Sequence, residues 1–213
     1  MRAARGGALA SSEHTSEKTE EAALGRIIAL SDAVIAFAIT LMVLDVRVPD
    51  NLLAGQVGQA LLDLRPKYFG CALSFVVIAV YWIEHHRMFT RIIHYDRRLI
   101  WLNFLFLFFI AFLPFTTDMI GEYGNVPIVV VVYAALGAAV GFSKEAIWWY
   151  ASHNHRLIDP EMSQQAVNRS LVAGLIAPVV FLASLAIVPL SSDAAMYSWL
   201  MMMPLKFLAH RAT

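Results

Sequence analysis

Long apolar runs dominate this sequence and restrict what it can fold into. A hydrocarbon core about 30 Å thick needs roughly 20 consecutive, mostly apolar residues per helix. A helix also satisfies its own backbone hydrogen bonds, which lipid cannot do. The sequence therefore predicts an all-α integral membrane protein with six transmembrane helices. The six runs cover residues 27–46, 68–87, 99–117, 126–150, 170–189 and the shorter 194–208.

Composition supports a membrane location and excludes other classes. The 213 residues are 59% hydrophobic and 15% charged, whereas a soluble domain carries about 25% charged residues. A chain of this length cannot hide so much apolar surface in one water-soluble core. The formal net charge is zero, so no overall field attracts nucleic acid. The single cysteine, Cys71, lies in an apolar run, which favours helix packing over a disulfide or metal site.

The distribution of basic residues predicts the orientation of the chain. Cytoplasmic loops near span ends keep an excess of lysine and arginine. With the N-terminus in the cytoplasm, only Arg47, Arg65 and Lys67 of the 16 lysines and arginines fall on the outer side. An even number of spans then returns the C-terminus to the cytoplasm. We expect a disordered cytoplasmic tail at 1–25, a transmembrane domain at 26–209, a short tail at 210–213, and a short amphipathic helix in the outer loop 45–67.

The first apolar run carries an acidic residue that needs an explanation. Asp32 within an apolar span costs a few kcal/mol unless it has partners. Arg26 is six residues away, on a different face of a straight helix, so both residues must look to other helices or to interfacial water. Because each residue of a helix is rotated by about 100° from the last, residues spaced at three and four positions form a stripe, and Asp32 lies to one side of it. This stripe either faces a pore or makes an ordinary contact with another helix. It contains Leu30, Ala33, Phe37, Thr40 and Leu44.

Three segments together resemble one known family. The first begins at Arg26, continues after three intervening residues as Leu30-Ser31-Asp32, and has Thr40 eight residues after the aspartate. The other two are the segment from Trp82 to Phe89, which contains His85, and Asn103 followed eleven residues later by Pro114. This combination, over about the first 117 residues, resembles the endosomal and lysosomal transmembrane potassium channels and their short prokaryotic relatives. The sequence departs from their pattern at Leu30, where the family has phenylalanine.

The resemblance implies a multi-pass protein of a cell membrane, namely a prokaryotic plasma membrane. It also implies a homotetramer with four copies of the first helix around a pore. By position, Phe37 corresponds to the hydrophobic constriction and Thr40 to a polar ring beside it. The family usually has isoleucine or leucine at the constriction, so Phe37 is a second departure. The expected pore-lining residues are Ala33, Phe37, Thr40, Leu41 and Leu44. The resemblance also implies a polar network that positions this helix, formed by Arg26, Ser31, Asp32, Trp82, His85 and Asn103.

These expectations lead to a potassium-permeable channel without a bound cofactor or metal, in which potassium passes transiently near Thr40. Its partners are membrane lipid and further copies of the chain. No Thr-Val-Gly-Tyr-Gly segment is present, which excludes the conventional carbonyl filter. The alternative is a proton- or cation-coupled secondary transporter that uses Asp32, His85 and Glu84. A scaffold without ion flux stays open as well. An enzyme is not expected, because no HExxH, GxSxG or P-loop pattern occurs.

Overall fold

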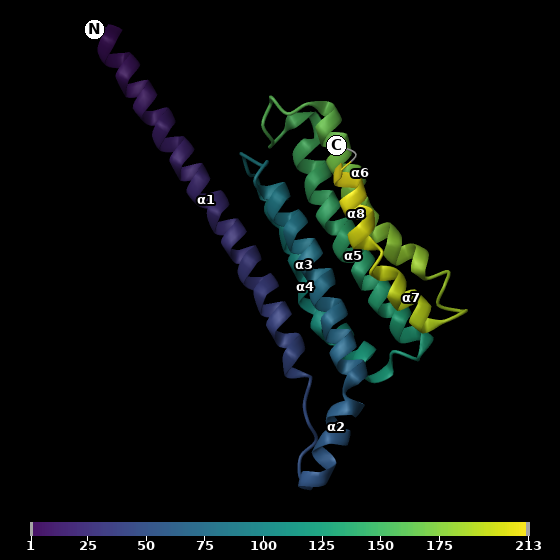
Figure 1. Ribbon diagram of the computed structural model, residues 1–213. Coiled ribbons are helices and arrows are strands. Elements are labelled where there is room, and N and C mark those ends of the chain that lie inside the picture. The colour runs from purple at the N-terminus through teal and green to yellow at the C-terminus, as the bar shows by residue number, and fades with distance from the viewer. Residues whose placement is uncertain (1, 212–213) are drawn as a thin grey trace.

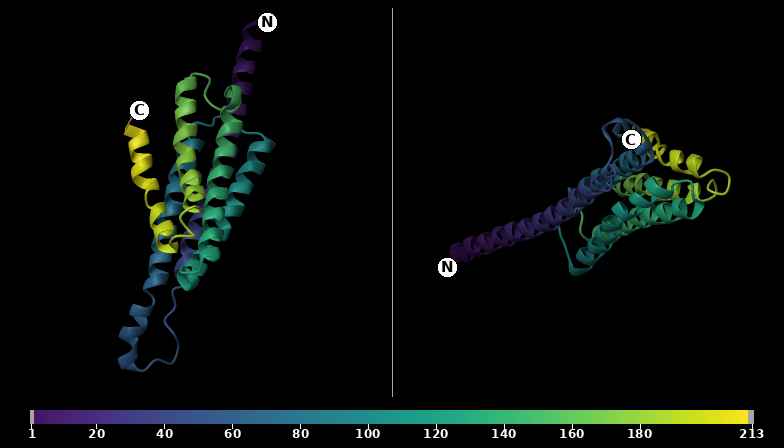
Figure 2. Two further views of the ribbon diagram at one scale, coloured as in Figure 1. Left: turned by 90° about the vertical axis from the view of Figure 1, so that its right-hand side faces the viewer. Right: turned by 90° about the horizontal axis from the view of Figure 1, so that it is seen from below.

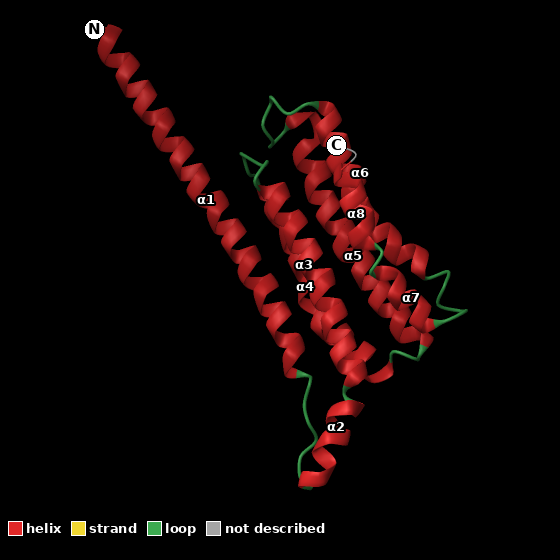
Figure 3. Ribbon diagram, in the orientation of Figure 1, coloured by secondary structure: helices red, strands yellow, loops and turns green. Residues whose placement is uncertain are grey.

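The computed structural model describes the backbone of residues 2–211 and the side chains of residues 18–209, and helices form all the regular structure in this range (Figure 3). The predicted all-α membrane fold is confirmed. Two single turns of 3-10 helix, Ala54–Gln56 and His153–His155, accompany the α-helices. The α-helices are α1 Arg2–Leu44, α2 Val57–Asp63, α3 Arg65–Phe89, α4 Arg97–Tyr123, α5 Pro127–Ser152, α6 Gln164–Ser184, α7 Ser192–Trp199 and α8 Met202–Arg211.

Within this range, five helices are long and apolar enough to cross a membrane. They match the first five predicted runs. Helix α6 is shifted toward the N-terminus, because it covers Gln164–Ser184 where the predicted run covers 170–189. The last predicted run is divided into α7 and α8 by a turn at Leu200 and Met201. Pro204 accounts for this break, because its ring in a continuous helix would clash with the carbonyl group of Leu200.

The long helix α1 lies along one side of the bundle and extends beyond it at its N-terminal end (Figure 1). It packs against α4 and α3. Its helical conformation includes residues 2–25, where the sequence favoured a disordered tail. Both chain termini lie at one end of the molecule, and the loop containing α2 lies at the opposite end (Figure 2). The predicted outer-loop helix corresponds to α2, none of whose residues is buried.

The connections after α3 and α5 meet at the end of the bundle where the termini lie. Ile92 and Ile158 form an isolated antiparallel bridge, and the Ile93 amide donates to the Leu157 carbonyl at 2.9 Å. Asp96 caps α4 by accepting from the Leu99 amide at 2.8 Å, and the Tyr150 hydroxyl donates to the same carboxylate. Partial burial tends to raise the pKa of Asp96, but these hydrogen bonds outweigh it and hold the pKa below its ordinary value.

Helix α5 is the centre of the second half of the bundle, packed between α4 and α6. Glycines allow α6 to approach closely: a Cβ atom on Gly137 would lie 2.7 Å from the Phe181 ring, and one on Gly141 would lie 2.7 Å from Pro178. Small residues at such contacts are the usual route to tight helix packing in a membrane. The stacked rings of Tyr133 and Trp199, with centroids 4.7 Å apart, attach α7 to this centre.

Candidate functional site

Helix α1 has two different faces. One face is buried against α3 and α4, with side chains spaced at three or four residues: Ser31, Ile35, Ala38 and Met42. The opposite face has no cover from the rest of the chain, and its central side chain, Phe37, is 65% exposed. A single chain therefore presents an apolar helix face with one polar group in its middle, the Thr40 hydroxyl.

The uncovered face contains most of the residues predicted to line a pore. Ala33, Phe37, Thr40 and Leu44 are all exposed on it or at its border. Leu41 is half-buried at the edge of the face, because it is rotated 80° from Ala33 toward the neighbouring helices. The face is also wider than the predicted stripe and includes the exposed residues Ala36 and Val43.

The Thr40 hydroxyl group is held in place by its own helix. Its Oγ1 atom donates a hydrogen bond to the Phe37 carbonyl oxygen at 2.9 Å. A hydroxyl oxygen also has two lone pairs that accept hydrogen bonds or bind a cation. Because the proton points back to the helix, the lone pairs are available on the exposed side of α1.

A neutral hydrogen-bond network connects α1 to α4 and α3. The Asn103 Nδ2 atom donates to the Ser31 Oγ atom at 2.9 Å, and Ser31 donates to the Ile27 carbonyl at 2.9 Å. The Asn103 Oδ1 atom lies 2.9 Å from the His85 Nε2 atom. Since an amide oxygen accepts, His85 donates from Nε2. Ser31, His85 and Asn103 are all buried, so the network holds α1 in one rotational position.

Asp32 is bound separately from this chain of hydrogen bonds. Its Oδ1 atom accepts from the Trp82 indole Nε1 at 2.8 Å, at the margin of the α1–α3 contact. The structure thus brings five of the six predicted network residues to the α1–α3–α4 junction. The sixth, Arg26, is exposed, and no hydrogen bond or ion pair joins it to the others among the described side chains.

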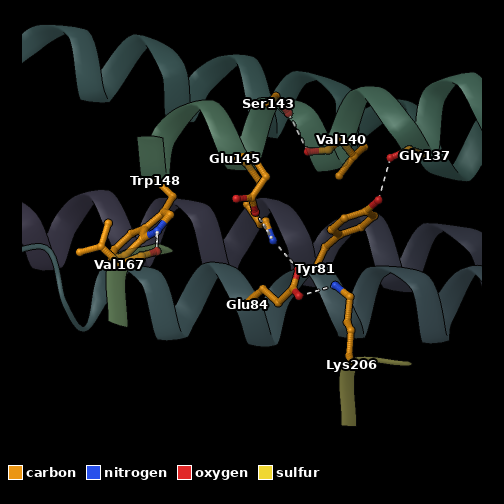
Figure 4. A network of polar contacts seen from close by, with 10 residues as sticks. Tyr81, Glu84, Gly137, Val140, Ser143, Glu145, Trp148, Val167 and Lys206 are labelled. Carbon is orange, nitrogen blue, oxygen red and sulfur yellow. Dashed lines mark hydrogen bonds and ion pairs between the residues drawn. The ribbon is translucent and has the colours of Figure 1, made fainter. Parts of the chain in front are cut away.

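A second polar cluster, which the sequence patterns did not lead us to expect, connects α3, α5 and α8 (Figure 4). Glu84 accepts from Lys144 and Lys206, and the Lys144 Nζ atom lies 2.9 Å from the Glu145 Oε1 atom. Lys144 is only 3% exposed, so its ammonium group is buried between the helices. We call Glu84, Lys144, Glu145 and Lys206 the ionic cluster.

A sequence signal for the ionic cluster existed. Lys144 and Glu145 lie inside the fourth apolar run, and Glu84 lies inside the second. Charged residues inside spans usually pair with one another. Close packing around the cluster also depends on Gly174, because a Cβ atom there would lie 1.9 Å from the Glu145 Oε1 atom.

The described residues contain no group of three histidine, cysteine or acidic side chains that could hold a metal ion. Cys71 is half-buried and has a free thiol.

Five apolar helices of spanning length with polar contacts buried between them define a polytopic helical membrane protein.

Comparison with known proteins identifies the family. The family model described as the endosomal/lysosomal potassium channel TMEM175 matches residues 26–114. A potassium channel of Streptomyces collinus is 34% identical over 152 residues, which cover 70% of this chain and 74% of that protein. A potassium channel of Chamaesiphon minutus is 34% identical over 157 residues, which cover 71% and 77% of the two chains.

A solved structure agrees with these matches. The crystal structure of a lysosomal potassium-selective channel TMEM175 homolog from Chamaesiphon minutus superposes with a TM-score of 0.76 at 27% identity. The superposition covers 88% of this chain and 98% of that chain. The chain belongs to the TMEM175 family, whose members named here are ion channels rather than enzymes.

Proposed function

We propose that this protein is a potassium-permeable channel, formed by four copies of the chain around an axis lined by α1. The observation that carries the proposal is the uncovered face of α1, with Phe37 and Thr40 at its centre and Ser31 anchored on the opposite side. We take potassium as the permeant ion because the relatives are named potassium channels. Membership of the family supports the same arrangement.

The chemistry of this face accounts for selective passage. A ring of four Phe37 side chains offers no ligands to a dehydrated cation, so it blocks ions unless it widens enough to stay wet. The four Thr40 oxygen atoms next to it supply a sparse polar ring. Potassium gives up its water more easily than sodium, so a passage with few oxygen ligands penalises sodium more.

The proposal includes a topology of six spans with both termini in the cytoplasm of a prokaryotic cell. Here α7 and α8 together form the sixth, interrupted span. The position of both termini at one end of the molecule supports an even number of crossings (Figure 2). Arg87, Arg91, Arg97 and Arg98 lie near the same end, which favours the cytoplasmic side.

Ion flux into liposomes that contain the purified protein tests the pore residues. We expect Phe37→Ala to raise potassium flux about tenfold, which corresponds to a barrier lower by about 1.4 kcal/mol. We expect Thr40→Val to lower the potassium-to-sodium flux ratio about fivefold, since about 1 kcal/mol of hydroxyl coordination is lost.

Two matched variants serve as controls. Phe115 is 62% exposed on α4, so Phe115→Ala removes a similarly exposed ring from another helix. Thr90 also donates its hydroxyl proton to a carbonyl three residues earlier, at 2.8 Å, which makes Thr90→Val the control for Thr40→Val. Equal flux changes in the Phe37 and Phe115 variants, or in the Thr40 and Thr90 variants, would contradict a pore lined by α1.

The secondary-transporter alternative has less structural support. The hydrogen bonds of His85 lead through Asn103 and Ser31 to the Ile27 carbonyl, whereas Asp32 bonds to Trp82. A relay from Asp32 to His85 would need these contacts to rearrange. Flux that saturates with potassium and depends on a counter-ion gradient distinguishes a transporter from a channel.

A further inference from the structure

One face of α3 changes from apolar to basic along its length. Residues spaced at three and four positions form a single stripe on a helix. Along this stripe the side chains are apolar toward the middle of the helix and cationic at the end of the bundle where the termini lie. In order, they are Val80, Ile83, Glu84, Arg87, Met88 and Arg91.

Two adjoining cavities follow this stripe. The first, of about 420 Å³, lies between α3 and α8, with an apolar wall of Val80, Ile83, Met203 and Phe207. The second, of about 80 Å³, lies between α3, α5 and α6 and is lined by Arg87, Arg91, Lys144 and Ser170, among others. Both cavities are open to the outside, and both include Glu84 and Arg87 in their walls.

The described side chains that line the two cavities include four basic residues and two acidic ones. The two carboxylates, Glu84 and Glu145, accept hydrogen bonds from the two ammonium groups of Lys144 and Lys206. Arg87 and Arg91 add two guanidinium groups one helical turn apart. The Arg91 guanidinium also donates to the Ser170 hydroxyl, and both residues line the smaller cavity.

We propose that these two cavities together form a binding site for an anionic phospholipid. The phosphate group binds between Arg87 and Arg91, and an acyl chain lies along Val80, Ile83, Met203 and Phe207. Guanidinium groups bind phosphate oxygens through paired, charge-assisted hydrogen bonds. Basic pockets between transmembrane helices are also the usual sites for anionic head groups. Assignment of the site to the cytoplasmic leaflet rests on the proposed topology, whereas the chemistry of the site does not.

The order of polarity favours a lipid as the occupant. A phospholipid in the membrane carries its phosphate at the surface and its chains toward the centre, and the stripe has the same order. The site is also formed by four helices, α3, α5, α6 and α8, that are distributed along the sequence. A bound lipid therefore contacts α8 and α3 at once and stabilises the docking of the C-terminal helix.

Lipid retention by the purified full-length protein tests the site. The probes are phosphatidylglycerol and phosphatidylcholine with identical chains, each added in nanodiscs or micelles, with bound lipid counted by native mass spectrometry. We expect the wild-type protein to retain phosphatidylglycerol and each of Arg87→Gln and Arg91→Gln to lower its affinity roughly fivefold, at about 1 kcal/mol per basic residue. Arg98→Gln, at the same end of the bundle but outside both cavities, should leave the affinity unchanged.

A second variant tests the acyl groove and separates lipid from free phosphate. Ile83→Trp fills the groove, so we expect it to lower the affinity for phosphatidylglycerol while leaving the arginines in place. Inorganic phosphate at millimolar concentration should not displace the lipid. Equal retention in wild type and both arginine variants would overturn the proposal, as would full displacement by inorganic phosphate.

Two further measurements separate lipid binding from misfolding and from contact between subunits. Size-exclusion profiles of the variants must match the wild type, and Arg91→Gln is the safer variant because Arg91 is exposed. If Ile83→Cys crosslinks through position 83 to a second copy of the chain, a neighbouring subunit covers the groove, which would overturn the lipid assignment. Loss of lipid binding with normal potassium flux, or the reverse, separates this proposal from the proposed channel function.

Discussion

Two neighbouring residues of α3 lead to two different kinds of polar contact. His85 points to α4 and α1 and takes part in a neutral network with Asn103 and Ser31. Glu84, one residue earlier and about 100° around the helix, belongs to the ionic cluster with α5 and α8. Helix α3 therefore makes two kinds of connection. Hydrogen bonds between neutral groups join α3 and α4 to the proposed pore helix α1, and ion pairs join α3 to α5 and to the C-terminal helix α8.

The two contacts differ in how they respond to the loss of one partner. A neutral donor or acceptor left unsatisfied costs about 1–3 kcal/mol. A charge left buried without its partner costs about 3–5 kcal/mol. The ionic cluster is therefore the more fragile of the two under single substitutions, even though its net contribution to stability is not necessarily larger.

The largest effect is expected for Lys144→Met. Lys144 is the only described residue that bonds to both carboxylates of the ionic cluster, so its removal leaves Glu145 without its ammonium partner. We expect the free energy of unfolding in detergent micelles to fall by about 3–5 kcal/mol. Lys67→Met is the matched control, since the Lys67 ion pair with Glu122 is partly exposed and its loss should cost below about 1 kcal/mol. Similar losses in both variants would remove the distinction between buried and exposed ion pairs.

An intermediate effect is expected for Asn103→Ala. This change removes the partner of both His85 and Ser31, so the free energy of unfolding should fall by about 1–3 kcal/mol. Asn168→Ala removes an exposed amide on α6 that bonds only to Gln164 among the contacts described, and should change stability by at most about 0.5 kcal/mol. If Asn103→Ala proved as mild as the control, the neutral network would not hold α1 in place.

The smallest effect is expected for Trp82→Phe. The change removes the indole donor to Asp32, but Trp82 is 38% exposed, so water or lipid head groups replace the lost hydrogen bond. The loss in thermal unfolding measurements should stay below about 1 kcal/mol. Trp101→Phe, on an exposed side chain of α4, is the control. A loss as large as that of Lys144→Met would place Asp32 in the same class as the buried charges.

The sequence predicted the five long spans and the outer-loop helix because hydropathy and helix length are local properties. It also predicted that Phe37 and Thr40 share a face, because helical periodicity is local too. The pairing of Ser31 with Asn103 came only through a family resemblance, since the two residues are 72 positions apart. The same resemblance led us to expect His85 and Asn103 as partners of Asp32, whereas Asp32 accepts from Trp82. Neither hydropathy nor periodicity indicates which side chains meet across such a distance.

By itself, the amino-acid sequence determined that this chain forms apolar helices and which residues share each helix face. The tertiary structure decided which of those faces are covered, that Lys144 pairs with Glu84 and Glu145, and that the last apolar run folds as α7 and α8. The physical reason is that lipid favours any apolar helix alike, whereas the positions of buried polar groups depend on partners that only packing brings within hydrogen-bond distance.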